Sequence, residues 1–254
     1  MPVFEIQSSQ NATWRKLHSL TTSKGLKKEG LYILCGEKLV REYAKQPAHD
    51  LVHIVTTARM GIPDFIASPD SIQLSQELFD ELDVVGTSFP LLILKQPDID
   101  CLNADDIASY SPHGLELVLP IGDPGNLGAV IRSAEAFGAA RVHLTQESAH
   151  PFLPKCIKAS AGSILRTKLC YGPSLSDYPS NCIALDTAGI SLNDFQWPEN
   201  GMLIVGEEGP GLGHHRINFD HKITIPTSGV ESLNAAVAAS IALWEWRRGR
   251  DLNP

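Results

Sequence analysis

The pattern of apolar and polar positions predicts strands and helices that alternate along the whole chain. Short apolar runs, or apolar residues alternating with polar ones, are typical of strands and occur at residues 31–35, 51–56, 115–119, 141–145, 182–186, 202–205 and 221–226. Helical spacing follows at residues 37–44 and 75–82, and again after residues 123 and 228. The 115–119 run, LELVL, is nearly continuous, as expected for a strand buried on both faces of a parallel sheet. This alternation indicates an α/β fold.

A change in composition near residue 100 divides the chain. Residues 95–114 are polar and acidic and lose the apolar periodicity of the flanking segments. Domain boundaries usually fall in such polar, proline-containing segments. We therefore predict a small α/β domain at 1–100, a linker at 101–113 and a larger α/β domain at 114–254.

Charge is distributed unevenly along the chain. The 254 residues carry a formal net charge of −8, which argues against indiscriminate nucleic-acid binding because such binding depends on phosphate neutralisation. Residues 11–45 are basic by contrast. This stretch is either a solvated helix face or a local RNA-binding patch, and composition leaves both open.

Cysteine usage and hydropathy exclude several classes of protein. The five cysteines are odd in number and form no C-x-x-C pair, so neither a zinc site nor a disulfide framework is predicted. No segment reaches the roughly 18 apolar residues that span a bilayer, and the N-terminus lacks the pattern of a signal sequence. We expect a soluble cytoplasmic protein with neither a membrane nor DNA as a partner.

The stretch at residues 225–234, IPTSGVESLN, connects the last predicted strand to the last predicted helix. Ser228 and Glu231 have the spacing of a capping box for that helix. The helix repeats apolar residues at Leu233, Val237, Ile241 and Trp244. We expect this face to be buried against the sheet. Ser232 and Asn234 are left near the helix start, where they serve as caps or as functional side chains.

Residues 123–138, DPGNLGAVIRSAEAFG, predict a strand-to-helix turn and a helix with one apolar face. Small residues and Arg132 near the helix start would let an anion or a nucleic-acid backbone approach the peptide N–H groups. The glycines at positions 122, 125 and 128 do not spell the dinucleotide-binding fingerprint, and no P-loop is present. A dehydrogenase is therefore disfavoured.

Two further segments are candidates for ligand contact. Residues 202–213, MLIVGEEGPGLG, predict a buried strand that runs into a glycine-rich loop, where the backbone either turns or approaches a ligand closely. Residues 155–163, KCIKASAGS, predict a helix of small residues packed on a neighbour. Cations that could in addition face RNA are Lys155, Lys158, Arg166 and Lys168.

In this order, the strings at 123–138, 202–213 and 225–234 resemble the three motifs of the SpoU (TrmH-like) branch of the SPOUT family, the RNA ribose 2′-O-methyltransferases. The resemblance covers residues 115–246, and the 155–166 segment resembles the region after motif one. It implies a C-terminal SPOUT-type parallel sheet with a deep trefoil knot. More weakly, residues 13–43 resemble the L30e-like RNA substrate-binding domain often found before a SpoU domain.

The resemblance also implies a reaction and its residues. It implies an S-adenosylmethionine-dependent enzyme that methylates a ribose 2′-hydroxyl in ribosomal RNA or tRNA and works as a homodimer, without a metal. The implied catalytic residues are Asn126, Arg132, Glu208, Ser232 and Asn234, and the implied cofactor contacts are Gly206, Ile225 and Leu233. Glu207 stands where the family usually has a small or amide residue.

A guanidinium holds its protons tightly and is a poor base, so Arg132 is better suited to stabilise a developing alkoxide than to remove a proton. The main rival interpretation is a non-catalytic SPOUT-fold RNA-binding or ribosome-assembly protein that has lost turnover. Intact motif residues argue against this rival. The acidic balance and the extra charge of Glu207 argue for it.

Overall fold

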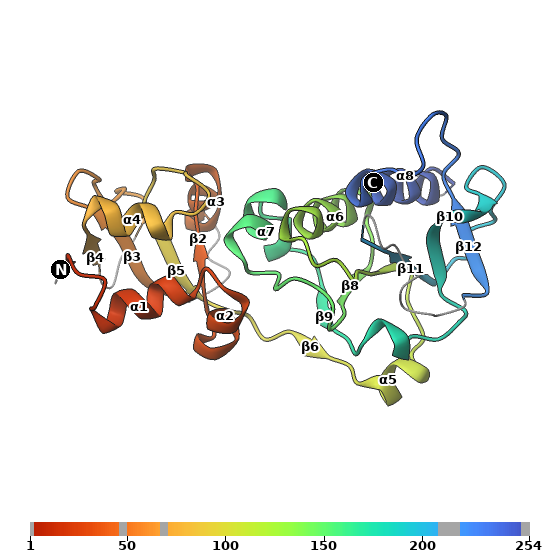
Figure 1. Ribbon diagram of the computed structural model, residues 1–254, viewed down its shortest axis with the longest axis horizontal. Helices are drawn as coiled ribbons and strands as arrows, with labels where there is room; N and C mark the ends of the chain where they lie inside the picture. The colour runs from red at the N-terminus through yellow and green to blue at the C-terminus, as the bar shows by residue number, and fades with distance from the viewer. Residues whose placement is uncertain (1–2, 46–49, 67–70, 208–218, 250–254) are drawn as a thin grey trace. The chain divides into compact units, whose positions relative to one another are not determined.

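The structure is a computed structural model that describes residues 3–45, 50–66, 71–207 and 219–249 (Figure 1). The chain divides into two compact units. The first consists of Met1–Asp98 and His150–Leu165, and the second of Ile99–Ala149 and Arg166–Pro254. Each unit has its own sheet, so the predicted α/β class is confirmed. No helix in the described ranges is long and apolar enough to cross a membrane.

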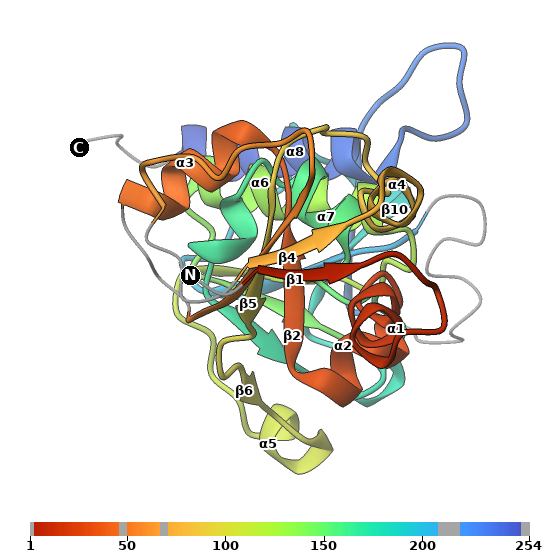
Figure 2. The same ribbon diagram turned by 90° about the vertical axis from the view of Figure 1, so that its left-hand side faces the viewer.

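The first unit is built on a mixed five-stranded sheet with the order β1-β4-β3-β5-β2 (Figure 2). Its strands are β1 (Val3–Ile6), β2 (Leu31–Leu34), β3 (Leu51–Thr57), β4 (Ser71–Leu74) and β5 (Leu91–Lys95). β1 and β3 run parallel to β4, whereas β5 runs antiparallel to β2 and β3. The predicted strands at 31–35 and 51–56 are therefore confirmed, and the other three were not predicted.

Helices cover the first sheet. They are α1 (Ala12–Ser19), α2 (Ser23–Glu29), α3 (Glu37–Lys45), α4 (Gln76–Leu82), α7 (Pro154–Ala159) and the 3-10 turn η1 (Ser163–Leu165). α1 packs on α2 and α4, and α7 packs on β2. A Cβ added at Gly25 would overlap the carbonyl of Ser19, so the close approach of α2 to the end of α1 requires glycine.

Residues 150–165 belong with the first unit, although they were assigned to the 114–254 domain. The ring of Phe152 is fully buried, with its centroid 4.8 Å from that of Tyr32 in β2. Lys158 Nζ donates to the carbonyl of Val85 at 2.7 Å. Sequence periodicity could not reveal this difference because these contacts join segments far apart in the chain.

The second unit contains a seven-stranded sheet with the order β12-β10-β11-β7-β8-β9-β6. All neighbouring strands run parallel. The strands are β6 (Asp100–Cys101), β7 (Leu115–Val118), β8 (Arg141–Leu144), β9 (Leu169–Tyr171), β10 (Ile183–Ser191), β11 (Gly201–Val205) and β12 (His221–Thr224). All four residues of β7 are buried, as the LELVL run predicts.

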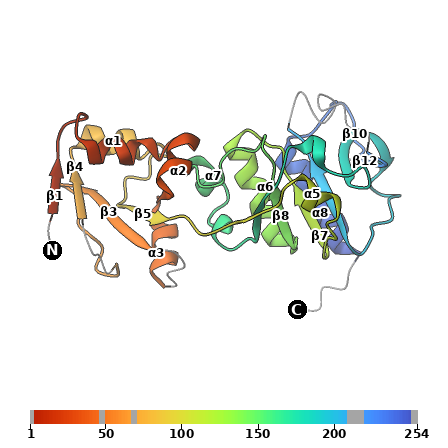
Figure 3. The same ribbon diagram turned by 90° about the horizontal axis from the view of Figure 1, so that it is seen from below.

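Helices α6 (Pro124–Phe137) and α8 (Ala235–Arg248) lie side by side on the second unit (Figures 1 and 3). Small residues let them approach, and Ser133 Oγ lies 2.7 Å from Ser240 Oγ across the contact. A separate apolar cluster includes Ile107, Val118, Tyr178, Ala184, Ile204 and Phe219. Two short elements contribute to this cluster, α5 (Ala104–Ala108) through Ile107 and the 3-10 turn η2 (Leu175–Asp177) through Leu175.

The predicted linker is more ordered than its composition indicates. Residues 101–113 contain the end of β6 and the whole of α5, both of which belong to the second unit. Asn103 and Asp106 form a reciprocal capping box that starts α5. Ile107 is fully buried in the apolar cluster. The one buried side chain of this capped helix is enough to dock the segment. A helix of five residues is too short to show apolar periodicity in the sequence.

The start and the buried face of α8 were both predicted wrongly. The helix begins at Ala235 with Asn234 as its N-cap, and so no capping box forms at Ser228 and Glu231. Three residues of the predicted buried face are exposed, Val237 by 48%, Ile241 by 36% and Trp244 by 47%. The buried residues are Ala235, Ala239, Ala242, Leu243 and Trp246. The face of α8 that packs closely on α6 is made mainly of small residues. A pattern of large apolar residues does not identify such a face.

Candidate active site

Two of the predicted catalytic residues meet at the starts of α6 and α8. Asn234 Nδ2 donates to Asn126 Oδ1 at 3.1 Å, although the residues are 108 positions apart. Asn234 Oδ1 caps α8 by accepting from the N–H groups of Ala236 at 3.0 Å and Val237 at 3.3 Å. Since the cap uses the oxygen, the amide nitrogen of Asn234 is left to reach Asn126. The helix cap therefore also orients the contact between motifs one and three.

The chain's own carboxylates occupy the start of α6. Asp123 is the N-cap, and its Oδ1 accepts from the Asn126 N–H at 2.8 Å. Glu207 Oε1 accepts from the Asp123 N–H at 3.0 Å. We predicted that an external anion could approach peptide N–H groups here. These two N–H groups are instead satisfied from within the chain.

The other predicted catalytic residues are not drawn into this group by a described contact. Arg132 lies on α6 and is exposed, and Ser232 is exposed two residues before the N-cap of α8. Glu208 lies outside the described residues. Their predicted roles stay predictions.

Two of the three predicted cofactor residues lie at one edge of the second sheet. Gly206 directly follows β11 and Ile225 directly follows β12, and both strands flank β10 in parallel. The carboxyl ends of parallel strands meet at the same sheet edge, which is where open α/β sheets bind ligands. Gly206, Ile225 and Leu233 are all half-buried. Apolar side chains beside an open glycine backbone suit a nucleoside-like ligand.

One segment at this edge was not predicted from the sequence. β10 continues past the predicted end at residue 186 to Ser191, with a register shift between Leu185 and Ile190 against β12. Thr224 Oγ1 donates to the carbonyl of Thr187 at 3.2 Å. A Cβ at Gly189 would overlap the backbone of Lys222. A glycine inside a strand is the signal that could have indicated this close approach.

Several basic residues considered for RNA contact have partners within the protein. Arg166 binds Glu135 through two hydrogen bonds of 2.5 and 2.9 Å, and Lys158 donates to Val85. In the N-terminal stretch, Arg41 pairs with Glu37 at 2.7 Å. Exposed ion pairs such as those of Arg166 and Arg41 are weak, so these two cations remain accessible to a stronger anion. Both interpretations of the basic stretch stay open.

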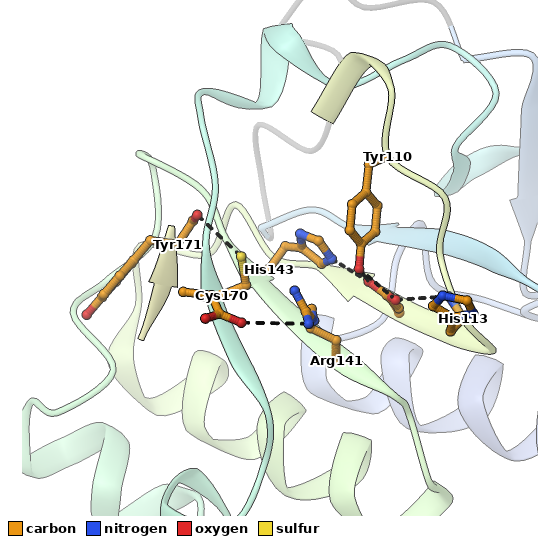
Figure 4. Close-up of polar contacts among 8 residues, drawn as sticks. Tyr110, His113, Arg141, His143, Cys170 and Tyr171 are labelled. Carbon is orange, nitrogen blue, oxygen red and sulfur yellow. Dashed lines mark hydrogen bonds and ion pairs between the residues drawn. The ribbon is translucent and has the colours of Figure 1, made fainter. Parts of the chain in front are cut away.

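A buried polar cluster joins β7, β8 and the segment that precedes β7 (Figure 4). His143 Nε2 donates to Glu116 Oε2 at 2.6 Å, and the exposed fractions of the two side chains are 0% and 2%. Tyr110 Oη donates to the same carboxylate at 3.0 Å, and the His113 N–H donates at 3.1 Å. Glu116 is the one charged residue in the LELVL run. This was the only feature of the sequence that could have indicated the buried cluster.

This cluster shifts the acidity of its members. Burial raises the pKa of the Glu116 carboxyl, but the hydrogen bonds from His143, His113 and Tyr110 outweigh burial and hold that pKa below its usual value. Burial and the neighbouring Glu116 raise the pKa of Tyr110 to about 12. At neutral pH a carboxylate is therefore held inside the second unit by three donors. It ties Tyr110, which follows α5, to the central strands.

Comparison with known proteins agrees with the motifs that meet at the starts of α6 and α8 and at the carboxyl edge of the second sheet. Residues 116–244 match the model of the SpoU rRNA Methylase family. The chain therefore belongs to the SpoU rRNA methylase family.

Two relatives illustrate the range of the family. The chain is 40% identical over 248 residues to the ribosomal RNA small subunit methyltransferase G 2 of Syntrophobacter fumaroxidans, across 96% of this chain and 49% of that protein. It is 30% identical over 264 residues to an uncharacterized tRNA/rRNA methyltransferase of Synechocystis, across 97% and 94% of the two chains. The chain spans about half the length of the first of these relatives.

A solved structure has the same fold. The SpoU methyltransferase AviRb from Streptomyces viridochromogenes, crystallised with AdoMet, superposes with a TM-score of 0.78 at 23% identity, across 95% of this chain and 98% of that one. The predicted SPOUT-type fold is thus confirmed, and this likeness is consistent with the predicted trefoil knot. The L30e-like character of the first unit stays a prediction.

Proposed function

We propose that this chain is an S-adenosylmethionine-dependent methyltransferase that methylates a ribose 2′-hydroxyl of RNA, in ribosomal RNA or else tRNA. The hydrogen bond between Asn126 and Asn234 carries this proposal, because it joins motif one to motif three. Family membership supports RNA methyl transfer. The names of the two relatives support ribosomal RNA or tRNA as the substrate class.

The main task of the protein in this reaction is to position the two reactants. When bound, S-adenosylmethionine supplies a methyl group on a sulfonium, which is already an excellent leaving group. Correct orientation of two reactants can lower a barrier by roughly 7–11 kcal/mol. Asn126 and Asn234 fix the starts of two helices against each other, and the half-buried Ile225 and Leu233 shape the cofactor edge.

One proton must leave the 2′-hydroxyl as the oxygen gains the methyl group. Arg132 stabilises the negative charge that develops on this oxygen, since an exposed guanidinium can donate hydrogen bonds to it. The proton passes to an RNA phosphate or to Glu208. Glu207, which counted towards the non-catalytic rival, directs its carboxylate to the Asp123 N–H, and this weakens the rival interpretation.

Calorimetric titration with S-adenosylmethionine tests the proposal without any choice of RNA. We expect saturable binding at about one site per chain, as is usual for a cofactor pocket. Gly206→Val should weaken this binding at least about tenfold, a loss of about 1.4 kcal/mol, because a side chain would enter the cofactor edge.

The matched control is Gly61→Val, since a Cβ at Gly61 meets no atom within 4 Å. It should bind the cofactor as the wild type does. Absence of wild-type binding at about 1 mM cofactor, both with and without RNA, would favour the non-catalytic rival.

We also infer a homodimer that uses the exposed face of α8. Val237, Ile241 and Trp244 follow one another at helical spacing and form an apolar stripe on the second unit. Exposed apolar groups of this kind are typical of protein interfaces. A second copy is the occupant that the family resemblance predicts.

Substitution of Ile241→Asp should convert the dimer to a monomer, because a carboxylate would be buried without a partner. Light scattering after size exclusion measures the mass. Val84→Asp is the control, since Val84 is 43% exposed but lies in the first unit. A wild-type monomer, or dimers of Ile241→Asp, would contradict the inference.

A further inference from the structure

We propose that Glu207 is a positioning residue that couples the loop after β11 to the catalytic start of α6. This inference rests on the proposed function, because it assigns a role in methyl transfer. In the sequence, Glu207 stands out only as an extra negative charge. Its contacts in the structure give the side chain a different task.

A continuous series of hydrogen bonds runs from Glu207 through all three motifs. Glu207 Oε1 accepts from the Asp123 N–H at 3.0 Å, across 84 positions of sequence. Asp123 Oδ1 accepts from the Asn126 N–H at 2.8 Å, and Asn126 Oδ1 accepts from Asn234 Nδ2 at 3.1 Å. Each residue therefore holds the next, and Glu207 is the member that comes from motif two.

The neighbourhood of Glu207 favours a carboxylate. A Cβ at Gly122 would lie 3.5 and 3.6 Å from its two oxygens, so the group rests against the backbone that leads into α6. The N-terminal end of a helix carries partial positive charge, and α6 has 14 residues. A carboxylate also only accepts hydrogen bonds, which matches the peptide N–H that it meets.

Loss of this contact should affect turnover more than binding. The Asp123 backbone would be freed, and Asp123 positions Asn126 as the N-cap of α6. A displacement of about 1 Å in a catalytic group can reduce a rate by about a hundredfold. Cofactor contacts at Ile225 and Leu233 come from other segments and should persist.

The first test compares Glu207→Ala with Glu207→Gln in methyl transfer from S-adenosylmethionine to in vitro transcribed ribosomal RNA and tRNA. Glu207→Ala should lower kcat at least about tenfold, with the KM for RNA and the cofactor Kd changed less than about threefold. Glu207→Gln keeps an acceptor oxygen and should restore kcat to within about threefold of the wild type. Glu199→Ala removes an exposed carboxylate before β11 and should have no effect.

The second test needs no RNA. Hydrogen exchange of peptides that cover residues 120–127 should be at least about threefold faster in Glu207→Ala, because the start of α6 opens more readily. Peptides from the first unit should be unchanged.

Wild-type kcat in Glu207→Ala, equal losses in the Ala and Gln variants, or unchanged exchange would each overturn the assignment. Wild-type protein that transfers no methyl group would instead refute the proposed function. In that case the exchange comparison still decides whether Glu207 holds the start of α6.

Discussion

Arg132→Ala is expected to abolish methyl transfer to RNA while S-adenosylmethionine still binds. Arg132 is exposed on α6, six positions after Asn126, and no predicted cofactor residue lies on that helix. Removal of one preorganised donor to a developing oxyanion costs on the order of 10²–10³ in kcat, or about 2.7–4 kcal/mol. Single-turnover methyl transfer with radiolabelled cofactor would measure the loss, and calorimetry would measure cofactor affinity.

Two further variants show whether the loss belongs to the guanidinium at this position. Arg132→Lys keeps the charge but not the planar fork of donors, so it should recover only part of the rate. Arg248→Ala removes another exposed arginine from the second unit, one that is paired with Glu245, and should leave the rate unchanged. If Arg132→Ala retains wild-type turnover, the assigned role is wrong.

His143→Ala is expected to destabilise the second unit strongly. The substitution removes the donor that lies 2.6 Å from Glu116 and leaves a carboxylate that is only 2% exposed. Losing a hydrogen bond to a charged group typically costs about 1.5–3 kcal/mol. Tyr110 and the His113 N–H remain as donors, so we place the loss near the lower end of that range. Urea unfolding would measure it.

A matched pair of variants separates the buried contact from a general effect of losing an imidazole. His143→Gln keeps an N–H donor and should be less damaging than His143→Ala, and it serves if the alanine variant does not fold. His221→Ala removes an exposed imidazole from β12 and should change stability by less than about 0.5 kcal/mol. Equal stability of His143→Ala and the wild type would show that the cluster contributes little.

The strands of the second unit could be predicted from apolar runs such as LELVL, which suit a strand buried on both faces, or from alternating apolar and polar residues. Runs at 115–119, 141–145, 202–205 and 221–226 all became strands of one sheet. The face of α8 could not be predicted in the same way. Its alanines pack on α6, whereas Val237 and Trp244 point away from the core. Residue size, rather than hydropathy alone, decides which face two close helices share.

The candidate site was predictable where the three motifs could be matched to a known family. The structure then brought Asn126 to Asn234 and placed Gly206 and Ile225 at one sheet edge. The contact of Glu207 with Asp123 could not be predicted, since it depends on how two loops 84 positions apart meet. The same holds for the partners of Glu116.

The first unit is assembled from two separated pieces of chain, which limits how freely the protein can exchange parts in evolution. The chain passes between the units after residues 98, 149 and 165, so one recombination point cannot transfer either unit whole. A fragment that starts at residue 114 would carry Phe152 without Tyr32 and would expose an apolar ring that is now fully buried. The N-terminal segment and residues 150–165 must therefore be inherited together, and substitutions in one should be compensated in the other.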